Sequence, residues 1–267
     1  MPKAKINGIT LYYEIHGAGE PLVLISGFSA DHLGWTPVLD AFAKHYQVIL
    51  LNNRGSGQTD APTGAYDIGQ MAQDTAALCD FLSIKQAHFI GNSMGGYIVQ
   101  QLAHDYPALT KSIVISNSSL FTESVFHYYL AAQLELMKSN AAPEILMRAM
   151  CTWIFSYHYL AQPGKYDELI QWGKNNPYPF TMAGYEGQFA ALNSFDSREW
   201  VSRIAVPTLV LTSDQDIVLS PVLSKKIVSA IKHAEFYCFE SCGHIPHIEK
   251  PHEYVRVVQN FLEQIIY

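Results

Sequence analysis

The residues that could do chemistry begin with Ser93, in the stretch F-I-G-N-S-M-G-G-Y at residues 89–97. Residues 87–90 have the composition of a short buried strand, whereas residues 97–103 carry apolar side chains at helical spacing. Ser93 therefore stands at a strand-to-helix turn, and glycines two residues away on either side avoid clashes in a tight bend. Such a turn holds the hydroxyl at the sheet edge and places the Met94 amide at a helix N-terminus, where it can stabilise an oxyanion.

A serine nucleophile needs a base to take its proton and an acceptor to fix the tautomer of that base. The glycine-rich pattern alone also fits a turn that only caps a helix, so these partners decide between the two interpretations. His244, in a loop before the last predicted helix, is the candidate base. Asp216, in a loop after an earlier predicted strand, is the candidate orienting acid.

Each of these partners has a competitor nearby. Asp214 lies two residues before Asp216, and we interpret it as a turn residue or a backbone cap. His247 lies three residues after His244 and could cap the last helix or face a substrate channel.

Seven apolar stretches predict the strands that position these residues, at 10–15, 22–26, 47–51, 87–91, 111–116, 207–212 and 234–239. Helical patterns occupy 67–83, 94–105 and 251–265. This alternation predicts an α/β protein with a mostly parallel central sheet and helices on both faces. Ser93, Asp216 and His244 then each follow the end of a predicted strand, in the order expected for a nucleophile, acid and base on such a sheet.

One region breaks the alternation. Residues 121–198 contain no convincing strand and are rich in aromatic and aliphatic side chains at helical spacing. Breaks at 141–143, 162–164 and 175–177 predict about four helices. We expect a core formed by 1–120 and 199–267, with 121–198 inserted as an all-helical cap.

Composition limits the classes of partner. The chain has 267 residues, 49% of them hydrophobic, and a net charge of -7 without a basic run, which argues against nucleic acid or an anionic membrane. No stretch is apolar over the ~20 residues of a spanning helix, and the start lacks a secretory signal core. Four widely spaced cysteines predict reduced thiols. We expect a cytoplasmic monomer or small homo-oligomer.

With these motifs in this order, the chain resembles the α/β-hydrolase superfamily over nearly its whole length. Residues 208–221 are similar to the acid loop of the family, and C-G-H at 242–244, followed by E-K-P at 249–251, is similar to its histidine loop. A serine at the turn implies the branch that forms an acyl-enzyme and hydrolyses it with water.

The stretch L-I-S-G-F-S at 24–29 resembles the His-Gly-x loop of the family, with Ser26 in place of the histidine. This resemblance implies that the backbone amides of Phe28 and Met94 form the oxyanion hole. The change at Ser26 leaves the amide in place but alters the hydrogen bonds that support the loop.

The stretch N-N-R-G-S-G-Q-T-D at 52–60 resembles the Asp-x-Arg-Gly-x-Gly-x-Ser loop of the family, with Asn52 and Thr59 as departures. We interpret its glycines as turn residues, because no phosphate-binding or dinucleotide motif is present. No His, Cys or carboxylate cluster has metal-ligand spacing. We therefore predict neither a cofactor nor a metal.

Within the superfamily the chain resembles small lidded carboxylesterases and lactonases, such as 3-oxoadipate enol-lactonase and the pimeloyl-carrier methyl esterase. We expect hydrolysis of a carboxylic ester or lactone of a small, largely apolar molecule. Trp153, Phe180, Tyr185 and Phe189 are candidate substrate-binding residues, although apolar stripes on helices usually face a core. The alternatives are a carbon–carbon bond hydrolase of ring-fission products and a ligand-sensing protein with slow turnover.

Overall fold

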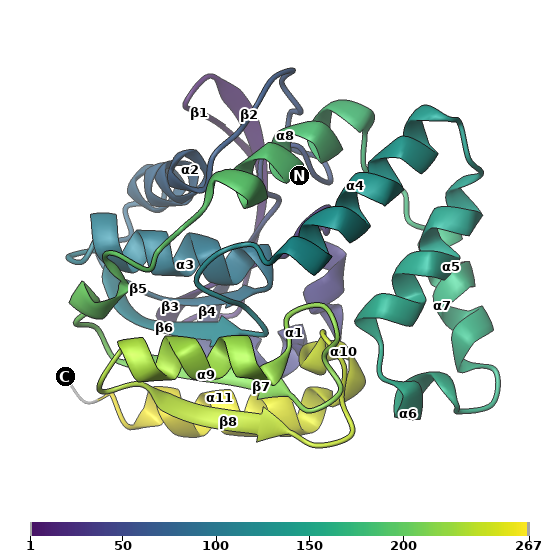
Figure 1. Cartoon of the computed structure of the whole chain (residues 1–267). Coiled ribbons are helices and arrows are strands. Elements are labelled where there is room, and N and C mark those ends of the chain that lie inside the picture. The colour runs from purple at the N-terminus through teal and green to yellow at the C-terminus, as the bar shows by residue number, and fades with distance from the viewer. Residues whose placement is uncertain (1, 266–267) are drawn as a thin grey trace.

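The computed structural model describes residues 2–265 and contains an eight-stranded sheet (Figure 1). The strands are β1 (Lys3–Ile6), β2 (Ile9–His16), β3 (Glu20–Ile25), β4 (Tyr46–Leu51), β5 (Ala87–Asn92), β6 (Thr110–Ser116), β7 (Thr208–Ser213) and β8 (Glu235–Phe239). Their order across the sheet is β1-β2-β4-β3-β5-β6-β7-β8. The β1–β2 and β2–β4 pairs are antiparallel, and all pairs from β4 to β8 are parallel. The predicted α/β class is confirmed.

All seven predicted strands are present, and β1 is an addition. Its four residues, K-A-K-I, include two lysines and form no apolar run, so periodicity did not reveal it. β1 pairs with β2 through a turn at Asn7 and Gly8, whose φ values are 48° and 79°. Asn-Gly is the sequence that best tolerates positive φ at both central positions of a two-residue hairpin.

Helices cover both faces of the sheet, as predicted. Outside the segment 121–198 they are α1 (Thr36–Ala43), α2 (Ile68–Phe81), α3 (Met94–Asp105), α9 (Pro221–Ala230), α10 (Pro246–Glu249) and α11 (Pro251–Glu263), with 3₁₀ turns at His32–Trp35 and Val201–Arg203. Strand residues alternate between two cores: Val23 and Ile25 pack with α2, α3 and α9, whereas Leu22 and Leu24 pack with α1 and α11.

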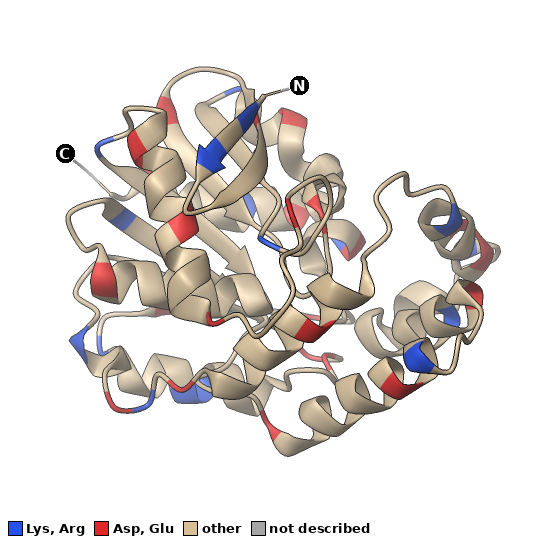
Figure 2. Ribbon diagram, turned by 90° about the horizontal axis from the view of Figure 1, so that it is seen from above, with Lys and Arg blue, Asp and Glu red and all other residues tan. Residues whose placement is uncertain are grey.

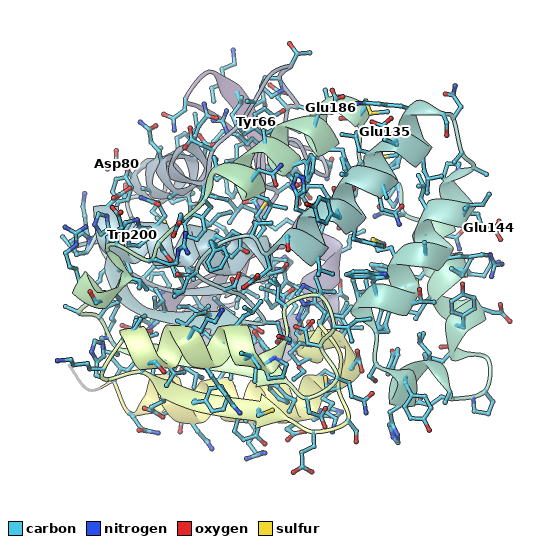
Figure 3. All side chains as sticks on the ribbon, in the orientation of Figure 1. Tyr66, Asp80, Glu135, Glu144, Glu186 and Trp200 are labelled. Carbon is cyan, nitrogen blue, oxygen red and sulfur yellow. The ribbon has the colours of Figure 1, made fainter. Side chains whose placement is uncertain are left out.

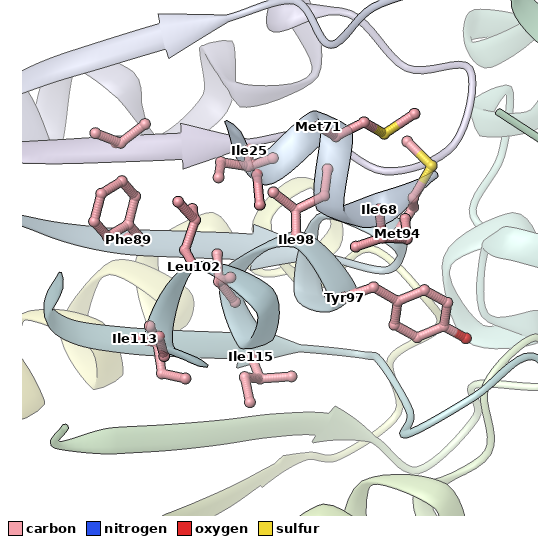
Figure 4. Packing of buried hydrophobic residues seen from close by; sticks show 14 of the residues in the cluster. Ile25, Ile68, Met71, Phe89, Met94, Tyr97, Ile98, Leu102, Ile113 and Ile115 are labelled. Carbon is pink, nitrogen blue, oxygen red and sulfur yellow. The ribbon is translucent and has the colours of Figure 1, made fainter. Parts of the chain in front are cut away.

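Helix α3 is the element that fixes the central turn. Figure 4 shows Ile98 and Leu102 of α3 lying over Ile25, Phe89 and Ile113 of the sheet, and all five are fully buried. Each buried side chain of this size contributes roughly 1.5–3 kcal/mol to stability. The residues that begin α3 are therefore held firmly against β3 and β5.

Five helices lie between β6 and β7: α4 (Ser124–Lys138), α5 (Pro143–Ile154), α6 (Tyr157–Leu160), α7 (Lys165–Lys174) and α8 (Met182–Ser194). The prediction of about four missed α6, a single turn that begins where the Ser156 side chain accepts a hydrogen bond from the Tyr159 amide. Helices α5–α7 stand away from the sheet, whereas α8 returns across it (Figure 1). A bridge between Phe121 and Asp196 joins the two ends of this segment.

Lysine and arginine residues are scattered over several elements rather than gathered on one of them (Figure 2). None of the helices formed by the described residues has the length and apolar character needed to cross a membrane.

Candidate active site

Ser93 directly follows β5 and has φ 56° and ψ -118°, a conformation that residues with a Cβ rarely adopt. Its amide donates to the carbonyl of Ser116 at 2.9 Å. Its carbonyl accepts from the Gly96 amide at 2.8 Å and from the Ser118 hydroxyl at 2.9 Å. These bonds hold the strained turn, and α3 begins at the next residue, Met94.

The two glycines of the motif are required by close backbone contacts. A Cβ on Gly91 would lie 2.0 Å from the carbonyl oxygen of Gly95, and a Cβ on Gly95 would lie 2.2 Å from that of Ile25. The start of α3 thus contacts the backbones of both β3 and β5, which no larger residue would permit.

His244 and Asp216 are brought together by the loops after β8 and β7. His244 Nδ1 lies 2.8 Å from Asp216 Oδ2, and both side chains are buried. The other carboxylate oxygen, Oδ1, accepts from the amides of Val218 and Leu219, each at 2.9 Å. A carboxylate at Nδ1 favours a proton there, which leaves Nε2 as the proton acceptor of the neutral ring.

Two asparagines join these loops to the strand ends. Asn92, which immediately precedes Ser93, donates through Nδ2 to the carbonyl of His244 at 3.2 Å. Asn117, directly after β6, donates through Nδ2 to Asp216 Oδ2 at 2.9 Å. The loops that carry Ser93, Asp216 and His244 therefore meet at the carboxyl edge of the sheet.

Sequence reasoning did not find Asn117. Its backbone has φ 47°, a conformation that asparagine tolerates better than most residues. An asparagine at the end of an apolar strand was the available signal, but its partner, Asp216, is 99 residues away in the chain.

The loop after β3 approaches the serine from the other side. A Cβ on Gly27 would lie 3.1 Å from the Cβ of Ser93, so this loop is in close contact with the turn. Within residues 2–265, the amides of Phe28 and Met94 donate to no protein acceptor. Both remain available to an oxyanion at the sheet edge.

The chain is similar to known proteins over most of its length. The sequence profile for the alpha/beta hydrolase fold matches residues 20–251. The protein belongs to the α/β-hydrolase family.

Similar members of this family come from several bacteria. A putative carbamate hydrolase of Azorhizobium caulinodans is 30% identical over 236 residues, 88% of each chain. The 3-oxoadipate enol-lactonase 1 of Acinetobacter baylyi is 26% identical over 97% of this chain and 95% of its own. The crystal structure of an enol-lactonase from Burkholderia xenovorans superposes with a TM-score of 0.88 at 26% identity, covering 98% of this chain and 100% of that one. The predicted enzyme class, a hydrolase acting on ester bonds, is confirmed at this level.

In this α/β-hydrolase, Ser26 replaces the expected histidine without leaving the loop unsupported. Its hydroxyl donates to the carbonyl of Asp31 at 3.0 Å and accepts from Trp35 Nε1 at 3.0 Å. All three residues are buried. A small hydroxyl and a neighbouring indole thus supply a hydrogen-bonded support for the loop.

The competitors of the acid and base have other partners. Asp214 Oδ1 accepts from the Cys242 amide at 3.1 Å, which agrees with its interpretation as a backbone cap. His247 is buried within α10 and stacks on Trp35 at a ring separation of 4.3 Å. It does not cap α11, whose N-cap is Lys250, so the predicted capping role of His247 is wrong, and a position facing a substrate channel stays a prediction. Burial lowers the pKa of His247 to about 3.

The loop at 52–60 is held by hydrogen bonds within itself and to neighbouring elements. Asn52 Oδ1 accepts from the His32 amide at 2.8 Å, and the Thr59 hydroxyl donates to the Asn52 carbonyl at 2.8 Å. Arg54 binds both carboxylate oxygens of Asp74, at 2.7 and 2.8 Å, and both side chains are buried. This cation is neutralised within the fold and is not presented to a phosphate.

Among the described residues there is no group of three or more His, Cys, Asp or Glu side chains arranged to hold a metal ion.

The four candidate substrate-binding aromatics separate into two sets. Tyr185 contacts the ring of Phe28 at 4.7 Å and that of Phe180 at 5.8 Å, so these side chains lie beside the loop after β3. Trp153 stacks on Tyr129 at 3.9 Å, and Phe189 stacks on His127 at 5.3 Å. The second pair of candidates therefore takes part in packing between helices of the segment 121–198.

Proposed function

We propose that the protein hydrolyses a carboxylic ester or lactone through an acyl-enzyme formed on Ser93. The observation that carries this proposal is the 2.8 Å contact between His244 Nδ1 and Asp216 Oδ2, in loops joined to the strained turn at Ser93. An oriented imidazole beside a serine at such a turn is the arrangement used by serine hydrolases.

In the proposed mechanism, His244 Nε2 takes the hydroxyl proton as Ser93 Oγ attacks the carbonyl carbon. The amides of Phe28 and Met94 donate to the oxyanion, and the loss of one such donor costs about 10²–10³ in kcat. His244 then gives its proton to the leaving alkoxide as the acyl–oxygen bond breaks. Water, activated by the same imidazole, attacks the acyl-enzyme and returns Ser93 to its free form. Asp216 stabilises the imidazolium in both steps.

We further propose that residues 121–198 act as a cap over a core formed by 1–120 and 199–267. Ser93 and His244 expose only 5% and 4% of their surfaces. A substrate that reaches Ser93 must therefore displace part of the structure above it. The helices that stand away from the sheet, α5–α7, are the natural moving part (Figure 1), and their opening breaks the hydrogen bonds that join Ile154 to His244 and Ser156 to Glu249.

The acyl group that this site accepts is uncharged and largely apolar. Among residues 2–265, which include every Lys and Arg of the sequence, Arg54 is the one buried cation, and Asp74 already neutralises it. A substrate carboxylate placed next to Ser93 would lose its hydration without gaining a counter-charge, which is costly. The rings of Phe28, Phe180 and Tyr185 offer instead an apolar wall.

A carbamate is the second candidate substrate, because a relative at 30% identity is named a putative carbamate hydrolase. Attack by Ser93 on a carbamate carbonyl would use the same base and oxyanion donors.

We also propose that the enzyme is cytoplasmic. All four cysteines lie in the described part of the chain as free thiols, and Cys79, Cys151 and Cys242 are buried. Reduced cysteines are typical of that compartment.

The test is hydrolysis of p-nitrophenyl acyl esters from acetyl to long chain by wild type, Ser93→Ala and the control Ser229→Ala. Ser229 is an exposed serine on α9. We expect a chain-length optimum and a loss of at least roughly 10³-fold in kcat for Ser93→Ala alone. Unchanged hydrolysis and unchanged labelling of Ser93→Ala by a serine-reactive phosphonate would refute the proposal.

The same assay separates the other candidates. A p-nitrophenyl hemisuccinate, compared with the butyrate ester, tests the preference for an uncharged acyl group, and an N-methylcarbamate tests the second substrate class. Stoichiometric release without turnover would favour a ligand sensor. Turnover of a ring-fission product in the absence of ester hydrolysis would favour a carbon–carbon bond hydrolase.

A further inference from the structure

Helix α8 contacts the loop after β3 at two points. Tyr185 meets the ring of Phe28 edge-on at 4.7 Å, and Gln188 Oε1 accepts from the Ser29 amide at 2.7 Å. Tyr185 and Gln188 are three residues apart, so they lie on the same face of the helix. One helix of the segment 121–198 thus contacts both the side chain and the following peptide of Phe28.

These contacts bear on the direction of the Phe28 amide. The peptide plane before Phe28 is held by a turn, in which the Gly27 carbonyl accepts from the Ala30 amide at 3.3 Å. In a trans peptide the N–H points opposite to the carbonyl, so this bond turns the Phe28 N–H away from Ala30. The plane after Phe28 carries the Ser29 amide, and Gln188 holds it. Ser29 itself has φ 56°, a strained value that needs such support.

Gln188 is itself firmly placed. Its side chain is fully buried, and its Nε2 donates to the carbonyl of Arg54 at 2.8 Å. A Cβ on Gly184 would lie 2.0 Å from the carbonyl oxygen of Gly55, so α8 lies against the core backbone. Tyr66, labelled beside α8 in Figure 3, donates its amide to the Gly187 carbonyl at 3.2 Å.

We propose that Gln188 is a positioning residue that aims the Phe28 amide at the oxyanion. This inference rests on the proposed function, in which that amide stabilises the tetrahedral intermediate. It makes α8 part of the catalytic framework rather than part of a moving cap. The oxyanion hole is then built from three separate segments: the loop after β3, the start of α3, and α8.

The first test is Gln188→Leu, which keeps the approximate volume and removes both hydrogen bonds. We expect kcat for the preferred p-nitrophenyl ester to fall roughly 10–100-fold with KM changed less than about threefold, because the donor acts mainly in the transition state. The matched control is Gln133→Leu. Gln133 is another buried glutamine of the segment 121–198, and its Nε2 donates to the Tyr129 hydroxyl. The control should keep the wild-type kcat.

The second test is Gln188→Glu, which separates positioning from packing. At acid pH the introduced carboxyl is neutral, so it can accept from the Ser29 amide and donate to the Arg54 carbonyl. Its kcat relative to wild type at the same pH should therefore be highest at the acid end and well above that of Gln188→Leu. Ionisation at higher pH would remove the donated bond and lower this ratio.

The outcomes distinguish the two proposals. If Ser93→Ala abolishes turnover but Gln188→Leu keeps the wild-type kcat, the positioning role is wrong and the proposed function stands. If both Gln188 variants lose activity equally at the acid end, packing rather than hydrogen bonding accounts for the loss, and the positioning role is again wrong. If Ser93→Ala leaves turnover unchanged, the proposed function itself fails.

Discussion

Ser156 donates both its amide and its hydroxyl to the carboxylate of Glu249, at 3.0 and 2.6 Å. The same carboxylate accepts from the Gly243 amide at 3.1 Å, one residue before His244. The His244 amide in turn donates to the carbonyl of Ile154 at 2.7 Å. The loop of the proposed base is therefore bound directly to the junction between α5 and α6.

This contact predicts a pH-dependent stability. Burial raises the pKa of Glu249, although its hydrogen bonds to Ser156 and Gly243 oppose the shift. A carboxyl whose pKa is higher in the folded state stabilises the fold below its unfolded pKa of about 4.3 and loses that contribution as pH rises. Wild type should thus lose stability relative to Glu249→Gln as pH rises above about 4.3. Urea unfolding of both proteins across this range measures the difference, and parallel curves would contradict the prediction.

Asn117 should support catalysis through Asp216. Its Nδ2 donates to Oδ2, the carboxylate oxygen that also contacts His244. Removing this donor in Asn117→Ala should lower kcat about 10-fold, because the carboxylate becomes free to turn. Asn117→Asp should lower kcat further, because its carboxylate would face the carboxylate of Asp216.

The matched control for this prediction is Asn140→Ala. Asn140 has φ 56°, close to the 47° of Asn117, but it is exposed at the end of α4. Alanine tolerates a positive φ less well than asparagine, so both variants strain the backbone to a similar degree. A similar fall in kcat in both would show that this strain, rather than the lost hydrogen bond to Asp216, causes the effect.

The identity of the acid is tested by two matched substitutions. Asp216→Asn should lower kcat roughly 10³–10⁴-fold, because the neutral amide neither fixes the productive tautomer of His244 nor stabilises its imidazolium. The kcat of Asp214→Asn should stay within about threefold of wild type, because the side-chain amide oxygen can still accept from the Cys242 backbone amide. Ester hydrolysis under saturating substrate compares the three proteins, and a reversed order would move the acid to Asp214.

His247 should make the fold sensitive to acid. The pKa of His247 falls to about 3 because of burial and, secondarily, the nearby His244. A histidine whose pKa is lower in the folded state does not reduce stability above its unfolded pKa of about 6.5. It destabilises the fold as pH falls from there towards about 3. Over this range the free energy of unfolding of wild type should fall by roughly 2–4 kcal/mol more than that of His247→Phe. Thermal or urea unfolding measures the difference.

The phenylalanine is a suitable replacement because it can stack on Trp35. Among the described residues, His247 Nδ1 is buried without a hydrogen-bond partner, so the substitution removes no bond at that atom. An equal acid sensitivity in the two proteins would place the responsible group elsewhere.

Much of the architecture could be predicted from local patterns. Apolar runs along the chain located the strands β2–β8. Elements without such a signature escaped prediction: β1 is short and half lysine, and α6 is a single turn. The correction at His247 has the same origin, since its stacking on Trp35 joins residues more than 200 positions apart.

The sequence by itself determined the candidates at the proposed site. The G-x-S-x-G pattern requires glycines because the backbones of Gly91, Gly95 and Ile25 are in close contact. Such a constraint can be recognised in the sequence as a motif. The order of Ser93, Asp216 and His244 along the chain is likewise visible without a structure.

Only the tertiary structure decided what surrounds those residues. Gln188, Asn117 and Glu249 act through hydrogen bonds to partners brought close by folding, and a single amide or carboxylate in a helix or loop has no sequence pattern of its own. The same holds for the separation of the four candidate aromatics into two sets, because the face that a helix presents to its neighbour depends on how the two helices pack.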